Sequence, residues 1–181
     1  MLIKSNQPHY HADTLLEHID DLYSYAMGLS CNHNDAEGLV QETYMRALPA
    51  FGRLRHVSNI KSWLFVILRN LWLHRVRQQP VVRTAEMDLG RDMPSITFTG
   101  SHMALVRQAH VRRAIEQLST EAREIILLRE FTELPYQEIA RVLDCPIGTV
   151  MSRLHRARSK LRILILDCLE ETDASTNYSS K

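Results

Sequence analysis

The stretch YQEIARVLDCPIGTVMSRLHR, residues 136–156, decides the fold. Its first eight residues have the apolar spacing of a short helix, and the segment from Asp144 to Gly148 interrupts that spacing with residues typical of a turn. Asp144 tolerates the left-handed backbone conformation that a tight turn between two helices requires. Ala140 supplies the small side chain needed where the helices cross. We therefore predict a helix-turn-helix.

The helix that begins at Thr149 presents two different faces. The face that would anchor it to the rest of the domain is apolar and consists of Val150, Leu154, Ala157 and Leu161. A polar and basic face lies about 100° around the helix and consists of Thr149, Ser152, Arg153, Arg156 and Lys160. An arginine on this face could pair with guanine in a major groove, while Arg158, Lys160 and Arg162 are better placed to hold phosphates. The structural alternative is a helical hairpin whose basic face is merely solvated.

Helical periodicity also dominates the rest of the chain, and no stretch alternates convincingly with the period of two expected of a strand. The helices expected before the quoted stretch span residues 13–29, 34–49, 58–78 and 105–118, followed by one that Ser119 caps. Asn34 and Glu37 are spaced as a capping box for the second of these helices, and Pro49 should end or bend it. The final helix should run from Thr149 to about Cys168.

The region between the fourth and fifth predicted helices, residues 79–104, has the glycine, proline and hydroxyl content of a linker. It separates two helical units, at residues 10–78 and 105–168, and residues 169–181 form an acidic and polar tail. We predict an all-α protein of two small helical domains joined by a flexible linker.

The charges are unevenly distributed along the chain, although 22 Lys and Arg against 21 Asp and Glu give a formal net charge of only +1. Residues 1–42 carry a net −6. Residues 43–85 carry +8 and residues 146–162 carry +5, in both cases without an acidic residue. Such acid-free basic blocks are typical of surfaces that bind polyanions.

Parts of both units resemble one protein family. The helix-turn-helix and the segment LSTEAREIILLR, residues 118–129, resemble region 4 of bacterial sigma factors of the extracytoplasmic-function (ECF) group of the sigma-70 family. DAEGLVQETYMRA, residues 35–47, and WLFVILRNL, residues 63–71, resemble region 2 of the same group. The resemblance covers roughly residues 10–78 and 105–165, in the family's order.

This resemblance implies a sigma factor that binds core RNA polymerase and directs promoter-specific transcription initiation, with an anti-sigma factor as a further partner. Region 2 would bind the clamp helices of the polymerase β′ subunit and melt the minus-ten element. Region 4 would sit on the β flap and read the minus-thirty-five element. For region 4, the DNA-binding residues implied are Thr149, Ser152, Arg153, Arg156, Arg158 and Lys160.

By position, the resemblance also implies two sets of functional residues in region 2, one that binds polymerase and one that binds the minus-ten element. The polymerase-binding residues are Asp35, Leu39, Gln41, Glu42 and Leu48. Gly38 stands where the family commonly has Asp, which removes one contacting carboxylate and weakens its helix by up to about 1 kcal/mol relative to Ala. The minus-ten residues are Arg53, Arg55, Asn59, Lys61, Arg69, Asn70, His74, Arg75 and Arg77. Of the two tryptophans, Trp63 falls on the apolar stripe of its helix, whereas Trp72 is the better surface candidate for stacking on a base.

The sequence offers no set of nucleophile, base and orienting group and no glycine-rich phosphate loop, so we expect neither enzymatic activity nor a cofactor. Cys31-x-His33 and His9-x-His11 are too short and sparse for a zinc site. The three widely spaced cysteines favour a reducing compartment, and no apolar run approaches the ~20 residues that cross a membrane. The expected location is the cytoplasm.

Two other functions fit parts of this pattern. A one-component helix-turn-helix regulator would bind DNA stably without polymerase. A mimic that sequesters an anti-sigma protein should lack productive basic faces, and Arg153 and Arg156 argue against it.

Overall fold

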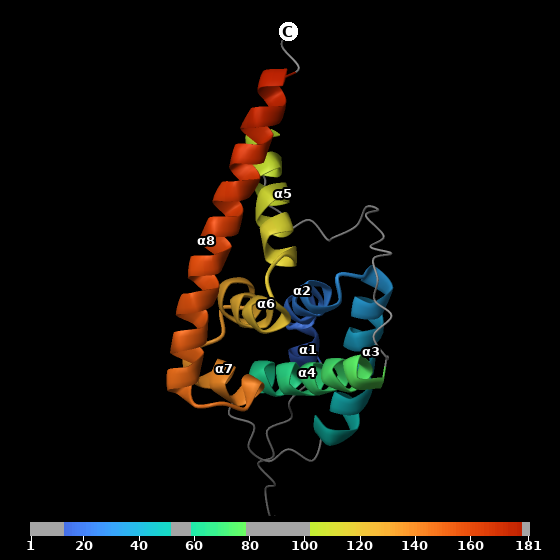
Figure 1. Cartoon of the computed structure of the whole chain (residues 1–181). Helices are drawn as coiled ribbons and strands as arrows, with labels where there is room; N and C mark the ends of the chain where they lie inside the picture. The colour runs from blue at the N-terminus through green and yellow to red at the C-terminus, as the bar shows by residue number, and fades with distance from the viewer. Residues whose placement is uncertain (1–12, 52–58, 79–101, 179–181) are drawn as a thin grey trace, which may run out of the picture.

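The computed structural model describes residues 13–51, 59–78 and 102–178, and every regular element in these ranges is a helix (Figure 1). The first group of helices is α1 (Asp13–Leu16), α2 (Ile19–Ser30), α3 (His33–Phe51) and α4 (Ile60–Gln78). The second group is α5 (His102–Glu116), α6 (Thr120–Ile126), the π-helical segment η1 (Leu127–Phe131), α7 (Tyr136–Leu143) and α8 (Ile147–Tyr178). The all-α prediction is confirmed.

The helices of the first group lie close to their predicted ranges, with two differences. A turn at Glu17 and His18 divides the first predicted helix into α1 and α2. The cap of α3 is Asn32 and not Asn34, because the Asn32 side-chain oxygen accepts a hydrogen bond from the Asp35 N–H at 3.0 Å. The predicted capping box is therefore wrong, and α3 also continues past Pro49 to its end at Phe51.

The helices of the second group follow the prediction more closely. Ser119 caps α6 by accepting from the Ala122 N–H at 3.4 Å, and α7 has the predicted bounds. Helix α8 runs to Tyr178, ten residues past the predicted Cys168. Neither glycine nor proline occurs after Gly148, so nothing local ends this helix early. Its distal half lies beside α5, where Leu164 and Cys168 are buried (Figure 1).

The two helix groups pack directly on each other. Helix α2 contacts α6 and η1, and helix α4 contacts α7. Buried side chains from both groups form one continuous apolar cluster. Within it, Tyr25 and Phe65 are fully buried in the first group, as are Ile125 and Leu128 in the second. Burial of this apolar surface favours the contact between the groups.

One buried polar cluster crosses this interface. Glu124 of α6 is 8% exposed, and its Oε1 accepts from the Tyr25 hydroxyl at 3.0 Å and from the Arg69 Nε at 2.8 Å. Burial, together with the neighbouring Glu124 carboxylate, raises the pKa of Tyr25 well above its ordinary value. The hydroxyl therefore stays protonated at neutral pH and can act as the donor.

Candidate functional site

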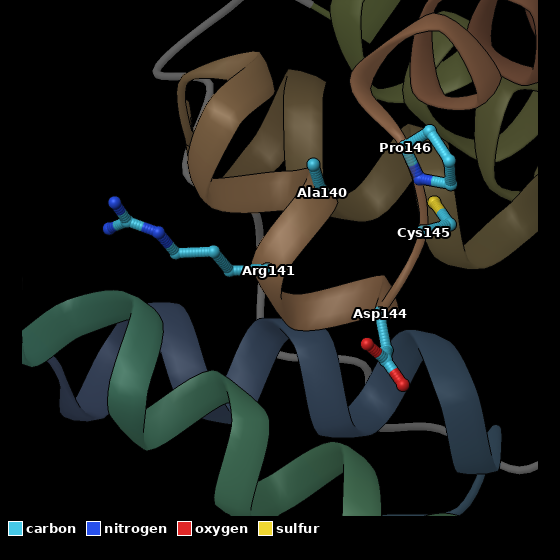
Figure 2. A pocket seen from close by; sticks show the side chains of 5 residues that line it. All are labelled: Ala140, Arg141, Asp144, Cys145 and Pro146. Carbon is cyan, nitrogen blue, oxygen red and sulfur yellow. The ribbon is translucent and has the colours of Figure 1, made fainter.

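The turn between α7 and α8 adopts the conformation that the sequence predicts. Asp144 ends α7 in the left-handed region, at a φ of 51°, and its N–H donates to the carbonyls of Ala140 and Arg141. The N–H groups of Thr149 and Val150 both donate to the Pro146 carbonyl and open the first turn of α8. Figure 2 shows the open hollow at this corner, lined by Ala140, Arg141, Asp144, Cys145 and Pro146.

The predicted anchoring face of α8 is confirmed. Val150, Leu154 and Ala157 are buried, and Leu161 packs half-buried against the same core. This anchoring turns the opposite face of α8 outward, toward solvent. The outward residues are Gly148, Met151, Ser152, His155, Arg156, Ser159 and Lys160.

The predicted DNA-binding residues of α8 do not all lie on this outer face. Ser152, Arg156 and Lys160 are exposed there, whereas Thr149 and Arg153 are partly buried at its edge. Arg158 lies toward η1, where its Nη2 and Nε contact the Glu130 Oε1 at 2.6 and 2.9 Å. These hydrogen bonds raise the pKa of Arg158.

Met151 and His155 lie on the outer face but are absent from the predicted set. Met151 is 55% exposed and lies between Gly148 and His155 at helical spacing. An exposed apolar side chain on such a helix can contact the methyl group of thymine, and a histidine can hydrogen-bond to a base edge or a phosphate. The predicted DNA-binding set contained only polar and basic side chains and therefore left out Met151. The spacing of Met151 from Gly148 and Ser152 nevertheless places it on the outer face of α8.

The predicted polymerase-binding residues of α3 also differ in how exposed their side chains are. Gln41 and Leu48 are exposed, while Asp35 and Glu42 are partly exposed. Leu39 is completely buried in the core and cannot present its side chain to a partner, which corrects its inclusion. Met45, 74% exposed, completes a surface stripe with Gln41 and Leu48 that the sequence analysis did not identify.

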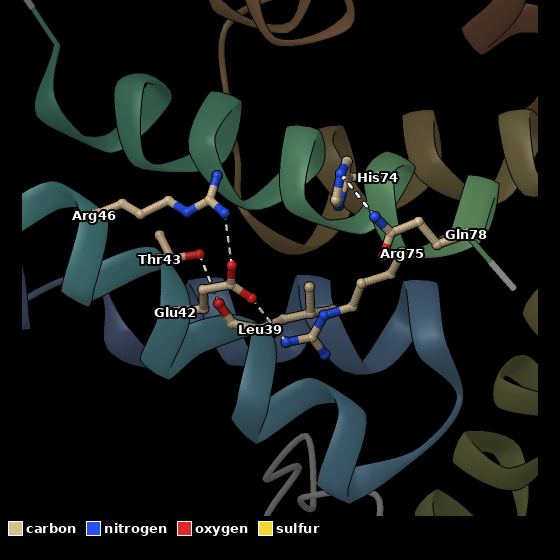
Figure 3. Close-up of polar contacts among 7 residues, drawn as sticks. All are labelled: Leu39, Glu42, Thr43, Arg46, His74, Arg75 and Gln78. Carbon is tan, nitrogen blue, oxygen red and sulfur yellow. Dashed lines mark hydrogen bonds and ion pairs between the residues drawn. The ribbon is translucent and has the colours of Figure 1, made fainter.

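Glu42 is held between two arginines (Figure 3). Its Oε1 accepts from the Arg46 Nη2 at 2.8 Å, and its Oε2 accepts from the Arg75 Nη2 at 3.1 Å. Arg75 Nη1 also donates to the Asp35 carbonyl at 3.4 Å, so the end of α4 is tied to α3 at two points. The carboxylate is thereby kept at the α3 surface in one orientation.

Several predicted minus-ten residues are used inside the fold. Arg69 pairs with Glu124, Arg75 with Glu42, and Lys61 Nζ lies 2.6 Å from Asp21 Oδ2. Asn59 caps α4 by accepting from the Ser62 N–H at 3.1 Å. The remaining described members, Asn70, His74 and Arg77, form an exposed stripe along α4. Arg53 and Arg55 lie outside the described residues.

The two tryptophans of α4 are not placed as predicted, with Trp63 in the core and Trp72 on the surface. Trp72 is only 5% exposed, and Trp63 is partly buried against the core. Trp72 is therefore a core residue and is withdrawn as a stacking platform. Packing on two sides of α4, by α3 and by α7, explains why a position opposite the predicted apolar stripe is also buried.

Within the parts of the chain that the structure describes, no three His, Cys, Asp or Glu side chains are grouped so that they could hold a metal ion. In the same parts, no helix has both the length and the apolar character to cross a membrane.

Comparison with known proteins identifies both units. Residues 15–80 match the family description "Sigma-70 region 2" and residues 109–161 match "Sigma-70, region 4". The chain is 33% identical over 154 residues to the ECF RNA polymerase sigma factor EcfG of Rhodopseudomonas palustris, with 84% of this chain and 83% of the relative covered. It is 32% identical over 148 residues to the RNA polymerase sigma-H factor of Pseudomonas aeruginosa, with 76% of each chain covered.

A solved structure is similar over most of its length. It is the co-crystal structure of the sigma factor RpoE with the anti-sigma factor NepR from Bartonella quintana, and it matches with a TM-score of 0.67 and 32% identity. The match covers 84% of this chain and 94% of that one. All three of these proteins are named as sigma factors, which favours a sigma factor over a one-component regulator. The chain belongs to the sigma-70 family, as an ECF RNA polymerase sigma factor that acts in promoter-specific transcription initiation.

Proposed function

We propose that the two helical units divide promoter recognition between them. In this proposal the unit of residues 105–168 reads the minus-thirty-five element, and the unit of residues 10–78 binds core polymerase and the minus-ten element. The observation that carries the proposal is the outer face of α8, where Ser152, Arg156 and Lys160 are exposed while the opposite face is buried. A helix anchored in this way can enter a major groove with its N-terminal half.

Base recognition is assigned to the outer face in the first three turns of α8. Arg156 can pair with guanine, Ser152 can hydrogen-bond to a base edge, and Met151 suits the methyl group of thymine. Lys160 lies one turn further along and is assigned to a phosphate. Thr149 and Arg153, at the edge of this face, are assigned to positioning contacts with the backbone.

Polymerase binding is assigned to the exposed side of α3. Gln41, Met45 and Leu48 form an uninterrupted stripe there, and Glu42 and Asp35 supply carboxylates beside it. Exposed apolar side chains such as Met45 and Leu48, flanked by polar and charged groups, are typical of the centre and rim of a protein interface. The partner surface is assigned to the clamp helices of the β′ subunit.

The minus-ten contact is assigned to the exposed stripe of α4, Asn70, His74 and Arg77. These side chains can follow the backbone of a separated strand, with Arg53 and Arg55 from the preceding segment. We also propose that an anti-sigma factor controls the chain in the cytoplasm, which is supported by the similarity to the Bartonella quintana sigma factor that was crystallised with NepR.

The decisive experiment is transcription in vitro with core polymerase and a library of genomic promoters. We expect a defined set of start sites that share two upstream elements, and altered promoter choice with Arg156→Ala. The activity of the same core preparation with another sigma factor serves as the control. Absence of any specific start site with an active core would overturn the proposal.

A further inference from the structure

Gly148, the second residue of α8, is a glycine that the fold does not require. The left-handed position of the preceding turn is occupied by Asp144, at a φ of 51°, and no glycine in the described ranges has a positive φ. A Cβ on Gly148 would meet no heavy atom within 4 Å beyond its chain neighbours and the backbone of its own helix. Because a glycine in a helix costs stability relative to alanine, neither backbone conformation nor lack of space explains this residue.

The other two glycines in the described parts of the chain lie against neighbouring side chains. A Cβ on Gly28 would lie 2.6 Å from the Leu127 Cδ2, so this position must stay bare for the packing of η1 on α2. A Cβ on Gly38 would lie 3.5 Å from the Arg75 Nη1, which is an ordinary contact. Gly148 differs from both because it is exposed and faces open space. A partner that approaches α8 from outside would explain a bare Cα at this point.

The surface around Gly148 is apolar. Ile147 is 43% exposed and Met151 is 55% exposed, and no acidic or basic residue occurs in α8 before Arg153. Arg153 is partly buried, so the first exposed cation of α8 is Arg156, about two turns after Gly148. The outer side of α8 thus changes from apolar to basic along the helix. We refer to Ile147, Gly148 and Met151 as the apolar start of α8.

The apolar start of α8 suits one feature of the major groove. The apolar group that a base pair presents there is the C5 methyl group of thymine. Ile147 and Met151 are neighbours on the helix surface at a spacing of i, i+4, and they can contact such a methyl group together. Gly148 lies beside them, so the backbone of the first turn can approach the DNA closely. A side chain at Gly148 would hold α8 away from the base edge.

We propose that Gly148 sets how deeply α8 enters the major groove, and that this depth lets Ile147 and Met151 read the methyl group of a thymine in the minus-thirty-five element. The inference rests on the proposed function, which assigns this element to the outer face of α8. Gly148 is a positioning residue, because it has no side chain and acts by allowing the contacts of its neighbours.

The test uses promoter DNA in which single thymines of the minus-thirty-five element are replaced by deoxyuridine, which lacks only the C5 methyl group. The full chain is assembled with core polymerase, and the DNA carries a promoter that this holoenzyme uses in vitro. We expect the wild-type holoenzyme to lose about fourfold in affinity at one or two thymine positions, the factor that corresponds to burial of one methyl group. Met151→Ala should remove this loss at the same position.

Gly148→Ala is the decisive variant. We expect it to bind the unmodified promoter about fivefold or more weakly, because contacts along the first turn are lost together, and to bind thymine and deoxyuridine DNA equally. The melting temperature of the free chain should stay the same or rise, since the methyl group meets open space and alanine favours a helix. Adding Met151→Ala to Gly148→Ala should weaken binding little further, because both changes remove the same contact.

Two further variants serve as controls. Gly38→Ala makes the same chemical change in α3 and should leave the discrimination between thymine and deoxyuridine unchanged. Lys160→Ala alters a residue assigned to a phosphate, so it should weaken binding to both DNAs equally and retain the discrimination.

Several results would overturn the proposal. In Gly148→Ala these are wild-type affinity, a loss of affinity with the discrimination retained, or a lower melting temperature, which would mean that the fold requires the glycine. In wild type, insensitivity to every deoxyuridine would also overturn it. The proposed function fails by a different result, which is that exchange of whole base pairs throughout the element leaves the affinity of the wild-type holoenzyme unchanged.

Discussion

Arg75 of α4 donates to Glu42 of α3 at 3.1 Å, and this pair links the helix proposed to bind polymerase with the helix proposed to bind DNA. The same guanidinium reaches the Asp35 carbonyl at 3.4 Å, while Arg46 holds the other Glu42 oxygen. The carboxylate is thus oriented from two sides but stays partly exposed. A partner donor can reach it without a change in the fold.

The first prediction concerns this carboxylate. Gln41→Ala with Glu42→Ala should weaken binding to core polymerase by about tenfold or more, since a hydrogen bond to a charged group contributes roughly 1.5–3 kcal/mol. The fold should be little affected, because partly exposed ion pairs contribute roughly 0–1 kcal/mol. Co-elution with core and a titration of binding measure the effect. Glu37→Ala, on an exposed carboxylate of the same helix, is the control, and an equal loss there would remove the specific role of Glu42.

The second prediction separates base contacts from phosphate contacts on α8. Arg156→Ala should cost roughly 1–3 kcal/mol of discrimination at one base position, and Met151→Ala should reduce a preference for thymine. Lys160→Ala should weaken binding to all sequences alike and lower the salt slope by about 1. Binding of the polymerase holoenzyme to promoter variants at several salt concentrations tests all three. Unchanged promoter choice in Arg156→Ala would exclude it from base recognition.

The third prediction concerns Arg158, which the structure holds against Glu130 rather than on the outer face of α8. Glu130→Gln removes the opposite charge, so Arg158 becomes free to contact phosphate. We expect DNA binding to strengthen several-fold at low salt, with the gain disappearing at high salt as exposed charges are screened. In the double variant Glu130→Gln with Arg158→Ala the gain should be absent. If the gain persists there, Arg158 is not its source.

The fourth prediction concerns stability at high pH. Burial, with a smaller effect of the Asp20 carboxylate, raises the pKa of Tyr44 to about 12. Because the folded-state pKa lies above the unfolded value of about 10, the stabilisation is complete below pH 10 and is lost as the pH rises toward 12. Chemical denaturation between pH 9 and 12 should show a shallower fall in Tyr44→Phe than in wild type. The same slope in both proteins would exclude Tyr44 as a contributor.

Local sequence rules predicted the helix-turn-helix correctly. The apolar spacing of Ile139, Val142 and Leu143 and the turn at Asp144 depend on residues only a few positions apart, and the structure confirms both. The capping of α6 by Ser119 is another local feature that was predicted. The boundary between α1 and α2, the cap of α3 and the end of α8 were missed, since these depend on competition between neighbouring caps and on packing with other helices.

The surface residues were harder to predict than the helices. Trp72 lies at a position that one-helix periodicity leaves open to solvent, but α4 packs against both α3 and α7 and buries it. Leu39 was predicted as a contact from the family resemblance, but it lies on the buried side of α3 with Val40 and Ala47. Met45 and Met151 are exposed because the opposite faces of their helices are anchored. The periodicity of a helix partly predicts which of its faces is buried. It does not predict that a second helix also packs on the opposite face, as happens for α4.

The sequence by itself determined the helical character of the chain, the helix-turn-helix and the family, because those follow from periodicity, turn chemistry and motif. Only the tertiary structure decided how the units meet: Glu124, Tyr25 and Arg69 are separated by up to 99 positions along the chain and come together in one buried cluster. No local pattern marks such a contact, since its free energy arises from desolvation and hydrogen bonding between groups that meet only after folding.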